Sequence, residues 1–176
     1  MSASLEDLYK QVIIDHYRNP KNKGDLPSPP AMKAKGYNPN CGDDVTMYLE
    51  VDDDRLSRIR LVARGCAVSV ASASMMSEAV EGKAIGDLRV VADRFRTMLR
   101  ARDVDLTEAA ANDTSTLGAN LGDLEALKGV ARVPERIKCA MLPWVTLEQG
   151  LADTQSGAHE ATPISTEEGG SADGPA

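Results

Sequence analysis

Residues 45–61 alternate apolar and polar side chains on either side of three consecutive aspartates. Every second residue from Val45 to Val51 is apolar, the aspartates at 52–54 favour a turn, and Ile59 and Leu61 alternate with arginines. This period of two predicts a β-hairpin with one apolar face. Such a face has to be covered by other elements of the chain.

Helical spacing of apolar residues surrounds the hairpin. One stretch runs from Leu5 to Tyr17 behind Ser4, a residue type favoured at helix N-caps, and a small-residue run at 67–81 follows the hairpin. A strongly amphipathic stretch covers 85–99, and another helix is predicted to begin near Pro134. The sequence therefore predicts an α+β fold, a small antiparallel β-sheet with helices packed on one face.

The C-terminal stretch 151–176 differs in composition from the rest of the chain. It contains five acidic residues, no Lys or Arg, and only Leu151 and Ile164 as sizeable apolar residues. Such a composition offers too little burial to offset the entropy of ordering, so we predict a domain at 1–150 followed by a disordered acidic tail. Residues 104–123, rich in Ala, Asp, Asn, Thr and Gly, are predicted to form an irregular surface insertion.

Charge and hydropathy exclude several classes of function. The net charge is −7 and no Lys/Arg-rich run occurs, so no nucleic-acid partner is expected. No run approaches the roughly 18 to 20 apolar residues that span a bilayer, and no membrane partner is expected. The chain opens with acidic Glu6 and Asp7 rather than a basic leader, so we expect a cytoplasmic location.

Three cysteines are too few, and odd in number, for a disulfide framework, which leaves thiols for metal binding or chemistry. Cys41 lies in a loop two residues before Asp43, and the hairpin would bring Cys66 back to the same end of the sheet. Sequence spacing does not place Cys139 beside them. The residues alone leave two interpretations open, a zinc site of three thiolates and one carboxylate, or ordinary buried cysteines.

Three motifs, in order along the chain, carry a resemblance to a known family. They are Asn38-Pro39-Asn40-Cys41-Gly42-Asp43, Gly65-Cys66-Ala67-Val68-Ser69 and Arg136-Ile137-Lys138-Cys139-Ala140. With the opening stretch around Asp15-His16 and Asn19-Pro20-Lys21-Asn22, they resemble the IscU/SufU family of iron–sulfur cluster assembly proteins over roughly residues 5–150. The resemblance implies a SufE/NifU-N-like fold.

Two departures from the IscU-type scaffold pattern favour the SufU-type branch. Lys138 stands where those scaffolds carry a histidine, and residues 132–136 lack the Leu-Pro-Pro-Val-Lys string that scaffolds offer to their chaperone. The resemblance therefore implies a zinc-dependent sulfur acceptor, a sulfurtransferase that is the obligate partner of a SufS-type cysteine desulfurase. A downstream iron–sulfur scaffold is the implied recipient of the sulfur.

At the matching positions, the resemblance implies Zn²⁺ held by Cys41, Asp43, Cys66 and Cys139, with Arg136 beside the sulfur site. In the implied mechanism a histidine of the desulfurase replaces Cys41 on the zinc. The freed thiolate then attacks the outer sulfur of the persulfide that the desulfurase carries.

Two other functions remain open on the same ligands. One is a scaffold that transiently binds an iron–sulfur cluster, and the other is a structural zinc domain that binds another protein. His16 lies on the apolar face of the first predicted helix, and we expect it to pack in the core rather than bind metal. His159 falls in the predicted tail, where we expect no role for it.

Overall fold

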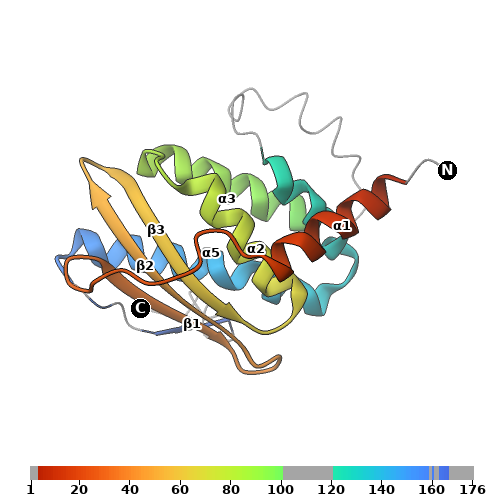
Figure 1. Ribbon diagram of the computed structural model, residues 1–176, viewed down its shortest axis with the longest axis horizontal. Coiled ribbons are helices and arrows are strands. Elements are labelled where there is room, and N and C mark those ends of the chain that lie inside the picture. The colour runs from red at the N-terminus through yellow and green to blue at the C-terminus, as the bar shows by residue number, and fades with distance from the viewer. Residues whose placement is uncertain (1–3, 101–120, 159, 161–162, 167–176) are drawn as a thin grey trace, which may run out of the picture.

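The computed structural model describes residues 4–100, 121–158, 160 and 163–166. In chain order the elements are α1 (Leu5–Arg18), β1 (Met32–Asn38), β2 (Asp43–Asp52), β3 (Arg55–Arg64), α2 (Ala67–Val80), α3 (Ile85–Arg100), η2 (Gly122–Arg132), α5 (Pro134–Gln155) and β4 (Ile164–Ser165). Figure 1 shows the helices stacked behind one face of the sheet. None of the described helices is long and apolar enough to cross a membrane.

The predicted hairpin is confirmed as β2 and β3, which pair antiparallel with Met47 opposite Leu61. Asp53 and Asp54 both have positive φ, as a two-residue hairpin turn requires. Val45, Met47 and Leu49 are buried beneath the helices, whereas the residues between them are partly exposed. The predicted α+β fold with helices on one face is therefore confirmed.

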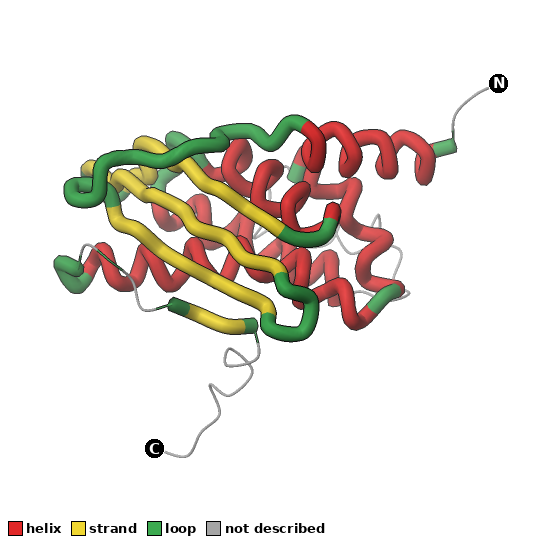
Figure 2. Tube along the Cα trace, turned by 60° about the horizontal axis from the view of Figure 1, so that its bottom comes forward, coloured by secondary structure: helices red, strands yellow, loops and turns green. Residues whose placement is uncertain are grey.

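The sheet is mixed rather than purely antiparallel, which corrects the expectation. Its order is β3-β2-β1-β4, and β4 pairs parallel to β1. The reason is the path of α5, which starts at the end of the sheet where β1 stops and runs back across the sheet. The strand that follows α5 therefore returns in the direction of β1 (Figure 2).

The prediction of disorder from residue 151 onward is wrong for residues 151–158 and 163–166. Helix α5 continues to Gln155, and Leu151 is only 3% exposed. Gly150 lets the helix approach the sheet, because a Cβ there would lie 2.8 Å from Leu49 Cδ1. Composition misses this segment because its order comes from packing and from strand pairing. His159 and residues 161–162 and 167–176 lie outside the described residues.

Most of the predicted insertion at 104–123 lies outside the described residues, because the structure does not describe residues 101–120. Gly122 and Asp123 are exposed as predicted, but they are part of a helix rather than irregular, which corrects that part of the prediction. Leu121 is buried, and Gly122 begins the 3₁₀-helix η2. The sequence patterns gave no element for η2, and its packing against α1, α2, α3 and α5 accounts for its order.

Candidate functional site

Three segments meet at one end of the sheet. They are the loop between β1 and β2, the connection from β3 to α2, and the first turns of α5 (Figure 1). The hairpin register brings the first two together, because Asp44 lies opposite Arg64 and the chain enters α2 directly afterwards. The structure places Cys41, Cys66 and Cys139 on these three segments, one on each.

Asn38 organises the loop that carries Cys41. Its carbonyl accepts the Gly42 N–H at 2.9 Å, and its side-chain Oδ1 accepts the Asn40 N–H at 3.1 Å. Gly42 has a φ of +72°, which a glycine adopts at little cost. These bonds close a tight turn in which the Cys41 side chain remains exposed while Asp43, two residues later, is buried.

Asp43 connects the loop to the start of α2. Its Oδ1 accepts the Cys66 backbone N–H at 2.8 Å, and its Oδ2 lies 3.8 Å from Cys66 Sγ. Gly65 permits this approach, because a Cβ on that residue would lie 2.0 Å from Asp43 Oδ1. One oxygen of Asp43 is thus occupied by the backbone, and the other faces the sulfurs.

Cys66 is the N-cap of α2, at the end of the sheet to which the hairpin was expected to return it. Its Sγ accepts the Ser69 backbone N–H at 3.5 Å. This bond fixes the Cys66 side chain at the start of α2.

Cys139, which sequence spacing could not place, lies on α5 with its Sγ 3.6 Å from Cys41 Sγ. It is fully buried, and the Asn38 side-chain amide donates to its sulfur at 3.9 Å. The fold therefore brings Cys41, Asp43 and Cys139 together, and Cys66 is next to them through its 3.8 Å contact with Asp43.

The donor atoms suit a small divalent cation. One ligand atom from each of Cys41, Asp43 and Cys139 lies within 4.8 Å of the other two. A tetrahedral site with zinc–sulfur bonds of about 2.3 Å separates its sulfurs by about 3.8 Å, close to the observed 3.6 Å between Cys41 and Cys139. Cys66 touches this group through Asp43. Three sulfurs and one carboxylate could therefore hold Zn²⁺.

The electrostatics of the site also fit a bound cation. Burial, with smaller contributions from hydrogen bonds to Asp43 and Cys41, raises the pKa of the Cys139 thiol. Deprotonating it next to a carboxylate and two other sulfurs requires a compensating positive charge, which a metal ion provides.

Arg136 supplies further positive charge from the first turn of α5. Its guanidinium is exposed, and its pKa is raised first by Cys66 and then by Cys139. Arg136 is thus electrostatically linked to two of the three sulfurs.

Two residues of the site, Asn38 and Gly65, were not assigned a role from the sequence. Asn38 stood within a recognised motif, but an Asn before a Pro indicates only a turn. Its contact with Cys139, 101 residues away, depends on the tertiary fold. Residue 65 has to be a glycine because Asp43 lies against it, and that contact also depends on the tertiary fold.

Comparisons with known proteins agree with this architecture. Residues 8–112 match the family described as the NifU-like N-terminal domain. The chain is 38% identical over 156 residues to the zinc-dependent sulfurtransferase SufU of Bacillus subtilis, an alignment that covers 89% of this chain and 97% of that protein. It is 32% identical over 157 residues to the iron–sulfur cluster assembly scaffold protein IscU of Streptococcus pyogenes, covering 89% and 91%.

A solved structure supports the fold independently. The N-terminal part of a nitrogen-fixing NifU-like protein from Brucella abortus superposes with a TM-score of 0.70, covering 88% of this chain and 99% of that one. Its sequence identity is 22%, so the likeness concerns the fold alone. The family match and the two long alignments together show that this chain belongs to the NifU-like N-terminal domain family of iron–sulfur cluster assembly proteins, with SufU and IscU among its relatives.

Proposed function

We propose that this protein is a zinc-dependent sulfur acceptor that takes persulfide sulfur from a cysteine desulfurase for iron–sulfur cluster assembly. The observation that carries the proposal is the unequal exposure of the four donors. Cys139 and Asp43 are buried and Cys66 is half-buried, whereas Cys41 is exposed on its loop. One thiol can thus meet a partner protein while the other donors stay within the fold.

Zn²⁺ held by Cys41, Asp43, Cys66 and Cys139 would keep the thiols deprotonated and available without redox chemistry of its own. The chain's contribution is the arrangement of these donors. Asp43 is fixed through Oδ1 by the Cys66 amide, so its free oxygen faces the sulfurs without further reorganisation.

Cys41 is the proposed nucleophile. Its thiolate attacks the outer sulfur of the persulfide on the desulfurase, so a new sulfur–sulfur bond forms at Cys41. The sulfur–sulfur bond of the donor breaks, and the donor cysteine leaves as a thiolate. The guanidinium of Arg136, beside Cys66 and Cys139, is placed to stabilise the negative charge of the arriving and departing sulfurs.

A scaffold that assembles a cluster on the same ligands is the second candidate, and the 32% identity to an IscU scaffold favours it. Lys138, in place of the histidine that the resemblance led us to expect in scaffolds, supports the sulfur acceptor instead. A purely structural zinc domain fits the site less well, because structural zinc sites are usually closed whereas Cys41 is exposed.

Metal analysis combined with a desulfurase assay tests the proposal. Protein purified without air is expected to carry about one zinc per chain and no visible cluster. Added to a SufS-type desulfurase, it should accelerate alanine release, and Cys41→Ser should abolish that acceleration.

Arg89→Ala, a change of an exposed residue on α3, serves as the control and should behave as the wild type. Full stimulation by Cys41→Ser would overturn the assignment of the acceptor. A brown, iron-containing protein that transfers its cluster would favour the scaffold.

A further inference from the structure

A groove opens directly beside the sulfur site, where α1, α2 and the end of β3 meet. Its volume is about 360 Å³, and Leu61, Ala63 and Val70 form an apolar part of its wall. The groove reaches Gly65, the residue that precedes Cys66. An occupant of this groove would therefore lie next to the sulfur site without covering Cys41 on its separate loop.

Three cations line the same groove on a chain whose net charge is −7. They are Arg18 at the end of α1, Lys23 after it and Arg64 at the end of β3, all exposed. Within the described part of the chain, none of the three forms an ion pair. Positive charge left unneutralised at one place favours an anionic occupant.

The backbone of β3 offers hydrogen-bonding groups at this point. β3 is an edge strand, and at Leu61 its outer side is already paired. The Leu61 N–H donates to the Asn22 carbonyl at 3.0 Å, and the Gly24 N–H donates to the Leu61 carbonyl at 3.0 Å. Figure 2 shows the segment after α1 running along this edge.

Successive residues of a strand alternate the direction of their backbone groups, so the N–H and C=O of Ala63 point to the same outer side. Among the residues that the structure describes, neither group of Ala63 has a partner there. The existing pairing stops at Leu61, two residues before Ala63 and four before Gly65, where the groove reaches the sulfur site.

We propose that this groove docks an extended acidic segment of the sulfur-donating partner. The segment pairs with the free backbone groups of Ala63, places an apolar side chain against Val70 and brings carboxylates to Arg18, Lys23 and Arg64. The inference rests on the proposed function, because it assigns the occupant to the protein that delivers sulfur. It explains how a partner could be aligned beside Cys66 by contacts that take no part in the chemistry.

Two variants separate the contribution of charge from that of backbone pairing. Arg64→Glu reverses one charge in the groove, and Ala63→Pro removes only an N–H that points away from the hairpin ladder, a position where an edge strand tolerates proline. Arg89→Glu is the control, because it makes the same charge change at an exposed position on α3 outside the groove.

The probe is a SufS-type cysteine desulfurase, with affinity measured by titration calorimetry and by the half-saturating concentration in the alanine-release assay. We expect Arg64→Glu and Ala63→Pro to weaken binding by about tenfold, with maximal stimulation at saturation and metal content retained. The loss in Arg64→Glu should shrink at high salt, whereas Arg89→Glu should bind as the wild type does.

Wild-type affinity in Arg64→Glu, or equal losses in Arg64→Glu and Arg89→Glu, would overturn the docking surface. If circular dichroism shows that Ala63→Pro is unfolded, Arg64→Glu alone decides. Failure of the proposed function is distinguishable, because it appears as a wild-type protein that gives no stimulation or as a Cys41→Ser variant that stimulates fully, whatever the groove variants do.

Discussion

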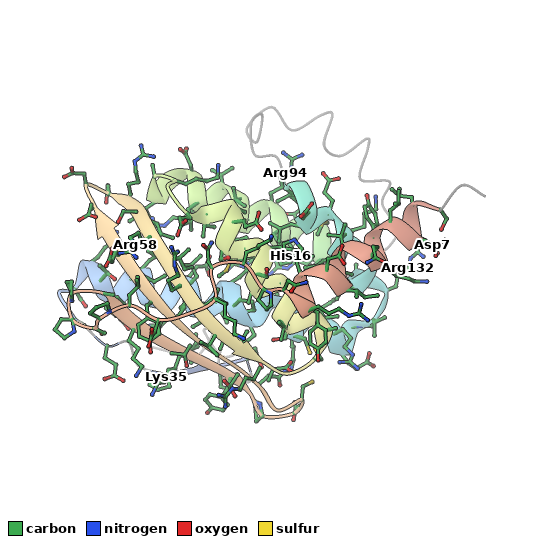
Figure 3. All side chains as sticks on the ribbon, viewed as in Figure 1. Asp7, His16, Lys35, Arg58, Arg94 and Arg132 are labelled. Carbon is green, nitrogen blue, oxygen red and sulfur yellow. The ribbon has the colours of Figure 1, made fainter. Side chains whose placement is uncertain are left out.

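Two clusters of polar side chains, each gathered from distant parts of the chain, differ in what they leave exposed. At the end of the sheet the donors surround an exposed thiol, Cys41. Where α1 meets α2 and η2, His16 lies between two partners, with Nδ1 2.7 Å from Ser74 Oγ and Nε2 2.9 Å from Asp123 Oδ2 (Figure 3). His16 thus packs in the interior, as expected from its place on the apolar face of the helix.

The second cluster has the residue types of a hydrolytic triad but not its accessibility. Ser74 is fully buried, and its hydroxyl also accepts the Lys21 backbone N–H at 2.8 Å. A nucleophile has to reach its substrate, so this Ser–His–Asp group ties elements together instead of reacting. Exposure and remaining bonding capacity, rather than residue type, distinguish the cluster that we propose to be reactive from the structural one.

Removing a proposed metal ligand should have the largest effect. Cys66→Ala is expected to lose the metal and to lower the melting temperature strongly, because structural zinc contributes on the order of 10 kcal/mol to folding and an exchangeable site somewhat less. Thermal unfolding with parallel metal analysis measures this, and chelator-treated wild type should resemble the variant. An unchanged melting temperature would show that the sulfur cluster does not support the fold.

Gly65→Ala tests how closely the sulfur cluster is packed. Gly65 has a φ of +139°, and an added Cβ would lie 2.0 Å from Asp43 Oδ1, so the carboxylate would have to move. Gly82→Ala is the matched control, since Gly82 has a φ of +81° and nothing within 4 Å of the added Cβ. Both should lose about 1 to 2 kcal/mol to backbone strain, but only Gly65→Ala should also lose metal. Equal metal content in the two variants would contradict the described role of Asp43.

His16→Ala should have the opposite signature, because the second cluster is structural. Loss of one buried and one partly buried hydrogen bond predicts a decrease of about 1 to 3 kcal/mol in the free energy of unfolding. Zinc content and desulfurase stimulation at saturating protein should stay at wild-type values. Chemical denaturation provides the measurement, with Lys10→Ala on the exposed side of α1 as the control. Loss of stimulation in a folded, zinc-loaded His16→Ala protein would remove the distinction between the clusters.

The two clusters also show what the sequence can and cannot predict. Period-two alternation predicted β2 and β3, and their register alone brings Asp43 to Cys66. The place of Cys139 depends on how α5 packs across the sheet, and no local pattern encodes that packing. The expectation that Cys139 joins the other donors came instead from the motif resemblance.

Two of the elements that the sequence did not predict, β4 and η2, share a cause. β4 has two residues, and it is held by backbone pairing to β1, which side-chain composition does not report. Helix η2 likewise owes its order to contacts with four helices, among them α1, where Asp123 meets His16. Predictions from composition failed where order depends on partners far along the chain.

The smallest predicted effect concerns the beginning of α1. It tests whether the cluster around His16 stabilises the whole helix or only its C-terminal half. Ser4 and Asp7 form a capping box, in which the Asp7 N–H donates to Ser4 Oγ at 3.2 Å and the Ser4 N–H donates to Asp7 Oδ2 at 3.3 Å. The Ser4 hydroxyl also donates to Asp7 Oδ2 at 2.8 Å. These bonds lower the pKa of Asp7 below its ordinary value. A carboxyl with a depressed folded-state pKa stabilises the fold above its unfolded pKa, and the contribution disappears as the pH falls through the folded pKa.

Corrected for the intrinsic exchange rate, which itself falls toward acid, the protection of amides in the first turn of α1 should therefore decrease in acid, while amides near His16 keep their protection. Asp7→Asn should remove the acid-induced part of the change at the first turn. If the amides around His16 lose protection together with the first turn, α1 opens as one unit. The hydrogen bonds of His16 to Ser74 and Asp123 would then not stabilise the C-terminal half of α1 independently of its first turn.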